Sequence, residues 1–123
     1  MATGFDDGLR SRGGVDNELC LRLWLLGYEL WSTPETVVRH SFRRRAPYPV
    51  AWADVLHNRL RLALVHLSAA RIARVMQTLG RDPEAGEALC GLLDSSVAER
   101  REAIARRRVR DDDWVFERFG LKW

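Results

Sequence analysis

Residues 13–28 read GGVDNELCLRLWLLGY, a glycine pair that runs directly into a leucine-rich stretch and ends at another glycine. Leu19, Leu23 and Leu26 follow one another at spacings of four and three residues, which is typical of one face of an α-helix. Asp16 and Glu18 stand where the N–H groups of a helix start favour negative charge, and Gly27 is a typical C-cap. The stretch therefore predicts a glycine loop followed by a helix that begins near Asp16 and ends at Gly27.

Two short stretches after this helix have the residue types of β-strands. Residues 28–31 form the first, and residues 36–42, which begin with three β-branched residues, form the second. Pro34 lies in the turn between them, and a basic loop containing prolines follows at residues 43–49. Because two strands cannot build a full sheet, we expect both to be edge members of a sheet whose other strands lie outside this sequence.

The rest of the chain has helical periodicity. We expect helical structure over residues 50–79 with a break near Ser68, a clear break at 80–83, and helices over 84–93, from about 95 to 108, and over 114–119. Asp111, Asp112 and Asp113 are predicted to cap the last helix. The expected fold class is therefore α+β and predominantly helical, with two short strands near the N-terminus followed by several helices.

Composition excludes some classes of protein. Hydrophobic residues make up 46% and charged residues 30%, as in ordinary soluble domains, and no run of 18 apolar residues exists that would span a membrane. The net charge of +3 is too small to argue for nucleic acid by itself. Cys20 and Cys90 lack the spacing of a metal or disulfide framework, so we expect them to be reduced and buried. A cytoplasmic location is expected, with the membrane surface left open.

Three groups of residues could carry chemistry. Carboxylates at a helix start beside a glycine loop, such as Asp16 and Glu18, can receive a proton from an attacking hydroxyl or hold a sugar hydroxyl. His40, at the end of a predicted strand, could bind a metal, and the arginines at 43–45 could meet a diphosphate. Each has a plainer alternative: helix capping for Asp16, an i,i+4 pair with Arg22 for Glu18, and a hydrogen-bonded strand histidine for His40. For the arginines at 43–45 the alternative is a solvated loop. The two other histidines, at 57 and 66, are expected to be ordinary surface or packing residues.

The order of these motifs resembles the C-terminal half of the catalytic domain of GT-A fold glycosyltransferases, nearest to the polypeptide N-acetylgalactosaminyltransferase type and its bacterial relatives. That family has a Trp-Gly-Gly-Glu-Asn segment, and later a Gly-His-Xaa-Phe-Arg segment followed by Pro-Tyr. The matching residues here are Arg12-Gly13-Gly14-Val15-Asp16 with Glu18, Leu19 and Arg22, then Arg39-His40-Ser41-Phe42-Arg43 with Pro47-Tyr48, and near the end Trp114-Val115-Phe116-Glu117. The resemblance covers nearly the whole chain.

The resemblance implies that residues 1–123 are one partial domain, with the acceptor and metal-site part at 1–48 and a helical part at 49–123. It implies transfer of a sugar from a nucleotide-diphosphate sugar to a hydroxyl acceptor, dependent on a divalent metal such as Mn²⁺. The implied roles are catalytic for Asp16 and Glu18, substrate-binding for Gly13, Gly14, Arg43 and Tyr48, and metal-ligating for His40. Asp16 and His40 are then expected to face the same crevice.

Two departures from the family pattern concern the donor. Val15 stands where the family has glutamate, and Arg12 stands where many members have tryptophan, so recognition of the donor sugar is left open. The family's nucleotide-binding half, with its Asp-Xaa-His or Asp-Xaa-Asp metal motif, has no counterpart in this sequence. We therefore expect the chain to be inactive alone.

Two other functions are considered. One is a non-enzymatic helical interaction or oligomerisation module that associates with itself through an exposed strand edge. The other is an arginine-driven nucleic-acid binder, which is disfavoured because no groove-reading motif is present.

Overall fold

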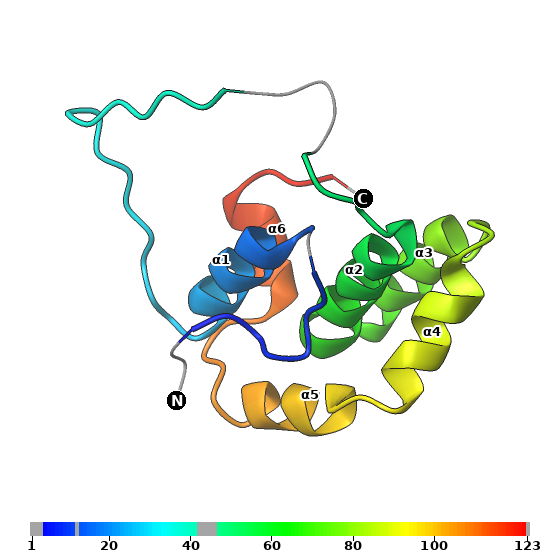
Figure 1. Cartoon of the computed structure of the whole chain (residues 1–123). Coiled ribbons are helices and arrows are strands. Elements are labelled where there is room, and N and C mark those ends of the chain that lie inside the picture. Colours follow the sequence, from blue (N-terminus) through cyan, green and yellow to red (C-terminus); the bar gives the residue numbers. More distant parts are fainter. Residues whose placement is uncertain (1–3, 12, 42–46, 123) are drawn as a thin grey trace.

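Six α-helices make up the regular secondary structure of the residues that the computed structural model describes, which are 4–11, 13–41 and 47–122 (Figure 1). Their bounds are α1 Val15–Leu25, α2 Trp52–His66, α3 Ala69–Leu79, α4 Ala85–Leu93, α5 Val97–Ala105 and α6 Asp112–Arg118. The predicted helices and the breaks near Ser68 and at 80–83 are confirmed. Asp111 caps α6 as predicted, because its carboxylate accepts a hydrogen bond from the backbone N–H of Trp114.

The predicted strands are wrong. No β-strand is present in the described part of the chain, and residues 28–41 instead leave the helices as an extended, exposed segment (Figure 1, cyan). Trp31, Val37 and Val38 expose 87%, 90% and 84% of their surface. β-Branched residues such as those at 36–38 favour an extended backbone, but a strand also needs a neighbouring strand as its hydrogen-bond partner, and no strand lies beside this segment in the described part of the chain. The observed fold class of the described residues is all-helical rather than α+β. Phe42, the last residue of the second predicted strand, lies outside the described residues.

Helix α2 is the central element. It packs against α3, α4 and α5 and also contacts α1 (Figure 1). Leu56 and Leu60 of α2 are fully buried against Ala88 and Leu92 of α4, and each buried leucine contributes about 1.5–3 kcal/mol. The apolar face of α2 therefore organises the helices around it.

Helix α1 is attached to the C-terminal part of the chain. Its C-terminal turn closes at Gly27, whose φ of +91° disfavours any residue with a side chain. A Cβ at this position would also lie only 2.7 Å from Cγ2 of Val109. The backbone N–H groups of Val109 and Arg110 both donate to the carbonyl of Leu25. Because Leu25 is fully buried, these bonds fix the end of α1 against the α5–α6 connection.

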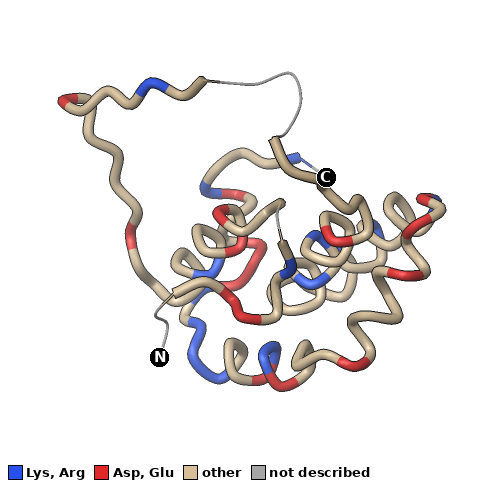
Figure 2. Tube along the Cα trace, in the orientation of Figure 1, with Lys and Arg blue, Asp and Glu red and all other residues tan. Residues whose placement is uncertain are grey.

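The surface carries both signs of charge. Figure 2 shows acidic and basic residues interspersed over the helices, with a continuous basic stretch in the α5–α6 connection, at residues 106–108. Within the described residues no helix is both long enough and apolar enough to cross a membrane. Cys20 and Cys90 are free, as expected, but both are exposed, so the prediction that they are buried is wrong.

Candidate functional site

The predicted glycine loop forms a tight turn at the start of α1. Gly13 and Gly14 have φ values of +100° and +73°, in the left-handed region that side chains disfavour. A Cβ on Gly13 would also lie 3.2 Å from Cγ1 of Val55, so the turn lies close against α2. The backbone here is accessible because it carries no side chains.

Asn58 of α2 holds this turn in place. Its Nδ2 donates to the carbonyl oxygens of Arg10 at 2.7 Å and Gly13 at 3.0 Å, and its Oδ1 accepts from the Arg10 N–H at 2.8 Å. The side chain is only 1% exposed. A buried amide that bonds the backbone of both Arg10 and Gly13 holds these two residues against α2.

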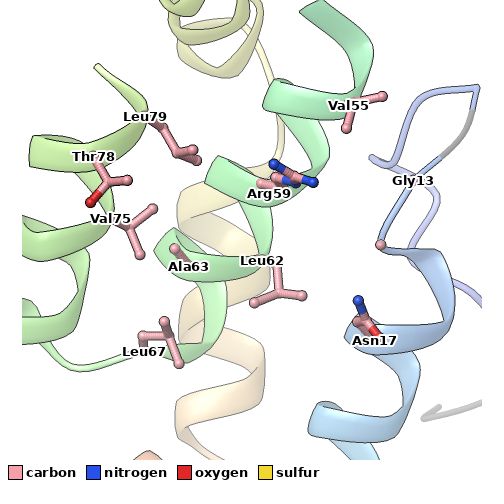
Figure 3. A pocket seen from close by; sticks show the side chains of 11 residues that line it. Gly13, Asn17, Val55, Arg59, Leu62, Ala63, Leu67, Val75, Thr78 and Leu79 are labelled. Carbon is pink, nitrogen blue, oxygen red and sulfur yellow. The ribbon is translucent and has the colours of Figure 1, made fainter. Parts of the chain in front are cut away.

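Two hollows flank the glycine turn. The first has a volume of about 460 Å³. It is lined by the glycine turn, by residues on either side of it, and by two residues at and before α2: Phe5, Ser11, Gly13, Gly14, Val15, Asp16, Val50 and Val55. The second, about 360 Å³, extends from the turn between α2 and α3 (Figure 3). Three of the predicted site residues, Gly13, Gly14 and Asp16, are thus brought together at the first hollow.

Asp16 lies in the first turn of α1 with its side chain exposed. A carboxylate at this position can accept a proton or a hydroxyl hydrogen bond from a molecule in the first hollow. Val15, the neighbouring lining residue, offers neither a hydrogen bond nor a charge.

Glu18 lies in a buried network and lines neither hollow. Its carboxylate accepts hydrogen bonds from Nε of Arg22 at 2.9 Å and from Nε2 of His66 at 2.8 Å, and Arg22 in turn donates to the carbonyl of Gly4 at 2.6 Å. Burial raises the pKa of Glu18, but the bonds from His66 and Arg22 outweigh burial, so the pKa lies below its ordinary value. The carboxylate therefore stays ionised and ties α1 to α2.

The remaining predicted site residues are in or beyond the extended segment. His40 and Tyr48 are exposed, and Arg43 lies outside the described residues. The stretch that contains His40 lies away from the start of α1 (Figure 1), so the structure does not bring His40 beside Asp16. No group of three or more His, Cys, Asp or Glu side chains in the described part of the chain could hold a metal ion.

The loop before the glycine turn is anchored by a buried ion pair. Asp6 and Arg61 have fully buried side chains, and Arg61 donates from Nε to Oδ2 at 2.8 Å and from Nη2 to Oδ1 at 2.9 Å. Burial raises the pKa of Asp6, but the bonds from Arg61 and from the Gly8 N–H, with the charges of Arg61 and Arg100, lower it below its ordinary value. The paired charges hold the loop on α2.

Sequence reasoning assigned no role in the site to the residues of α2 that position it. His57, Asn58, Arg61 and His66 are all buried and polar, and each bonds to the loop or to α1. His57, which bonds the Gly8 carbonyl at 3.1 Å, has a lowered pKa because burial disfavours its charged form. The available signal was that these polar residues share a helix with fully buried leucines, which marks a helix enclosed on more than one face.

Comparison with known proteins shows that part of this chain is similar to a glycosyltransferase. A stretch of 67 residues is 40% identical to polypeptide N-acetylgalactosaminyltransferase 11 of Xenopus tropicalis. About half of the chain resembles a glycosyltransferase. The match covers 53% of this chain but 11% of that protein, so the chain spans only a small part of its relative. No protein-family profile matches the chain, and no solved structure matches it.

Proposed function

We propose that this chain is part of a glycosyltransferase that transfers a sugar from a nucleotide-diphosphate sugar to a hydroxyl acceptor. The observation that carries the proposal is the 40% identity to an N-acetylgalactosaminyltransferase over 67 residues. The glycine turn and the adjacent Asp16 carboxylate at one hollow support it, because they offer a sugar both bare backbone and a proton acceptor.

In this proposal Gly13 and Gly14 let a sugar ring approach the backbone, and Asp16 accepts a hydrogen bond or the proton of the acceptor hydroxyl. Glu18 was expected to be catalytic, but its burial suits a positioning residue that keeps the first turn of α1 beside the hollow. Val15 would leave the donor sugar without the contact that glutamate makes in the resembling family.

The donor diphosphate and its metal form the second part of the proposal. His40 is proposed as a ligand of Mn²⁺, with Arg43 and Tyr48 beside the diphosphate. A bound divalent ion would offset the negative charge that develops on the leaving diphosphate. In this proposal the other ligands come from the family's nucleotide-binding half, because the described residues hold no group of three or more metal-ligating side chains.

The test compares this chain with the longest polypeptide encoded in frame with it. Each is incubated with UDP-N-acetylgalactosamine and UDP-glucose, with a hydroxyl acceptor and with or without Mn²⁺, and transfer is measured by mass spectrometry. We expect no transfer by the chain alone and transfer by a longer polypeptide. Asp16→Asn in that polypeptide should lower kcat by about 10²–10⁴-fold, the usual contribution of a general base. Asp7→Asn, at an exposed position in the preceding loop, is the matched control.

Undiminished transfer by the Asp16→Asn protein would remove Asp16 from the mechanism. If the chain alone shows no transfer and no longer reading frame exists, the transferase proposal fails.

A further inference from the structure

The hollow between α2 and α3 has the form of a ligand pocket. Its volume is about 360 Å³, and its lining is mostly apolar: Gly13, Gly14, Asn17, Val55, Arg59, Leu62, Ala63, Leu67, Val75, Thr78 and Leu79. Figure 3 shows the side chains of α3 facing α2 from one side, with Gly13 and Asn17 on the other. The glycine turn of the proposed active site thus forms one end of this hollow.

The size and the lining select an apolar occupant. A dry apolar cavity of about 150 Å³ holds a benzene ring, and pockets for small ligands begin at about 300 Å³. A volume of 360 Å³ therefore accommodates more than one ring or a short alkyl chain. Water there would meet mainly Leu62, Ala63, Val75 and Leu79, which offer it no hydrogen bonds.

Two polar side chains of the lining can bind a polar head group. Asn17 and Arg59 are both exposed, and the guanidinium of Arg59 lies 5.2 Å from the ring centroid of Trp52. No carboxylate of the described residues forms an ion pair with Arg59, so its N–H donors are open to hydroxyl groups. One guanidinium is a poor match for a diphosphate, whose several negative charges require several donors. The hollow therefore suits an uncharged hydroxyl compound better than the nucleotide donor.

The two hollows meet at the same residues. Gly13, Gly14 and Val55 line both of them, and Asp16 lines the first. A molecule whose apolar body fills the second hollow can thus carry a hydroxyl past the glycine turn toward Asp16.

We propose that the second hollow is the acceptor subsite and that the acceptor is an amphiphilic alcohol, with an apolar body between α2 and α3 and a hydroxyl at Asp16. This inference rests on the transferase function proposed above. The hydroxyl-bearing head is bonded by Asn17 and Arg59, and the apolar body supplies most of the affinity.

The test measures binding to the 123-residue chain without any donor, so that it is independent of transfer. The probes are hexyl β-D-glucoside, kept below the concentration at which it forms micelles, and methyl β-D-glucoside. They share one head group and differ by five methylenes. Each buried methylene raises affinity about fourfold, so the hexyl compound should bind at least about tenfold more tightly. The methyl NMR signals of Ala63 and Val75 should shift on binding.

A matched pair of variants locates the site. Thr78→Phe fills the hollow from its exposed lining and should weaken hexyl glucoside binding by at least about tenfold. Gln77→Phe adds the same ring at the neighbouring exposed position outside the lining and should leave binding unchanged. Equal affinity for the two glucosides, absence of binding by both, or equal loss in both variants would overturn the acceptor subsite. None of these results bears on transfer by the longer polypeptide, which tests the proposed function.

Discussion

Asn58→Asp tests whether the glycine turn depends on the buried amide of α2. The substitution preserves shape and keeps the acceptor for the N–H of Arg10, but it replaces the Nδ2 donor by a carboxylate oxygen. Two donated hydrogen bonds, to the carbonyls of Arg10 and Gly13, are lost. At about 0.5–1.5 kcal/mol each they account for roughly 1–3 kcal/mol.

The introduced charge adds to that loss. The side chain at 58 is 1% exposed, and a carboxylate there faces two carbonyl oxygens, so its pKa in the folded protein must rise above the unfolded value of about 3.9. Each pKa unit of this rise adds about 1.4 kcal/mol, so we expect a total loss of about 2–4 kcal/mol at pH 7. That loss is a large part of the free energy of unfolding, which is expected to be roughly 6–18 kcal/mol for a protein of 123 residues.

The assay is urea unfolding followed by circular dichroism at pH 7 and pH 4.5, with the parent chain measured alongside. Because folding raises the pKa of the carboxyl group introduced at position 58, the destabilisation is complete above that raised value and shrinks as pH falls below it. Asn17→Asp, the same change at an exposed position in the first turn of α1, should be neutral or slightly stabilising. A loss below about 0.5 kcal/mol at pH 7, or a loss that does not shrink at pH 4.5, would refute this account of the turn.

Three further predictions concern the same region. Asp6→Asn leaves the guanidinium of its buried partner unpaired and should cost about 3–5 kcal/mol in urea unfolding, whereas Asp7→Asn, next to it and exposed, should change little. Gly13→Ala, at φ +100° and against α2, should cost about 1–3 kcal/mol by thermal unfolding, whereas Gly86→Ala, in α4 with open space around it, should stabilise by roughly 0.5–1 kcal/mol. Because the pKa values of Asp6 and Glu18 are lowered on folding, their contribution is complete above the unfolded values of 3.8 and 4.5 and is lost as pH falls through the folded values. A melting temperature that does not fall between about pH 5 and pH 3 would contradict this assignment.

The helices were predictable because their signals are local. Leucine spacing, the glycines at 13, 14 and 27, and the cap at Asp111 are each read from a few neighbouring residues, and the structure follows them. The strands were not, because residues 28–41 have the residue types of strands while the backbone partner that a strand requires is not specified by those residues. Local propensity alone gave the wrong fold class.

Only the part of the candidate site that is local in sequence was predictable. Gly13, Gly14 and Asp16 are neighbours in sequence and lie together at one hollow, as expected for a glycine loop entering a helix. Their support from Asn58 crosses 45 residues, and the Asp6–Arg61 pair crosses 55. No periodicity in a single sequence specifies such pairings. For His40 the motif resemblance predicted a position beside Asp16, but the fold of this chain does not bring the two residues together.

The extended segment at residues 28–41 has a consequence for the integrity of the chain. Helix α1 is held by the hydrogen bond between His66 and Glu18 and by the bonds from the α5–α6 connection to Leu25, and the turn before it is held by Asn58. None of these bonds involves that segment. Cleavage by a protease anywhere between residues 30 and 41 would therefore leave two fragments that remain associated without a covalent link. The same two fragments, produced separately, should reassemble when mixed, since the information that joins them resides in the helices and not in the connection.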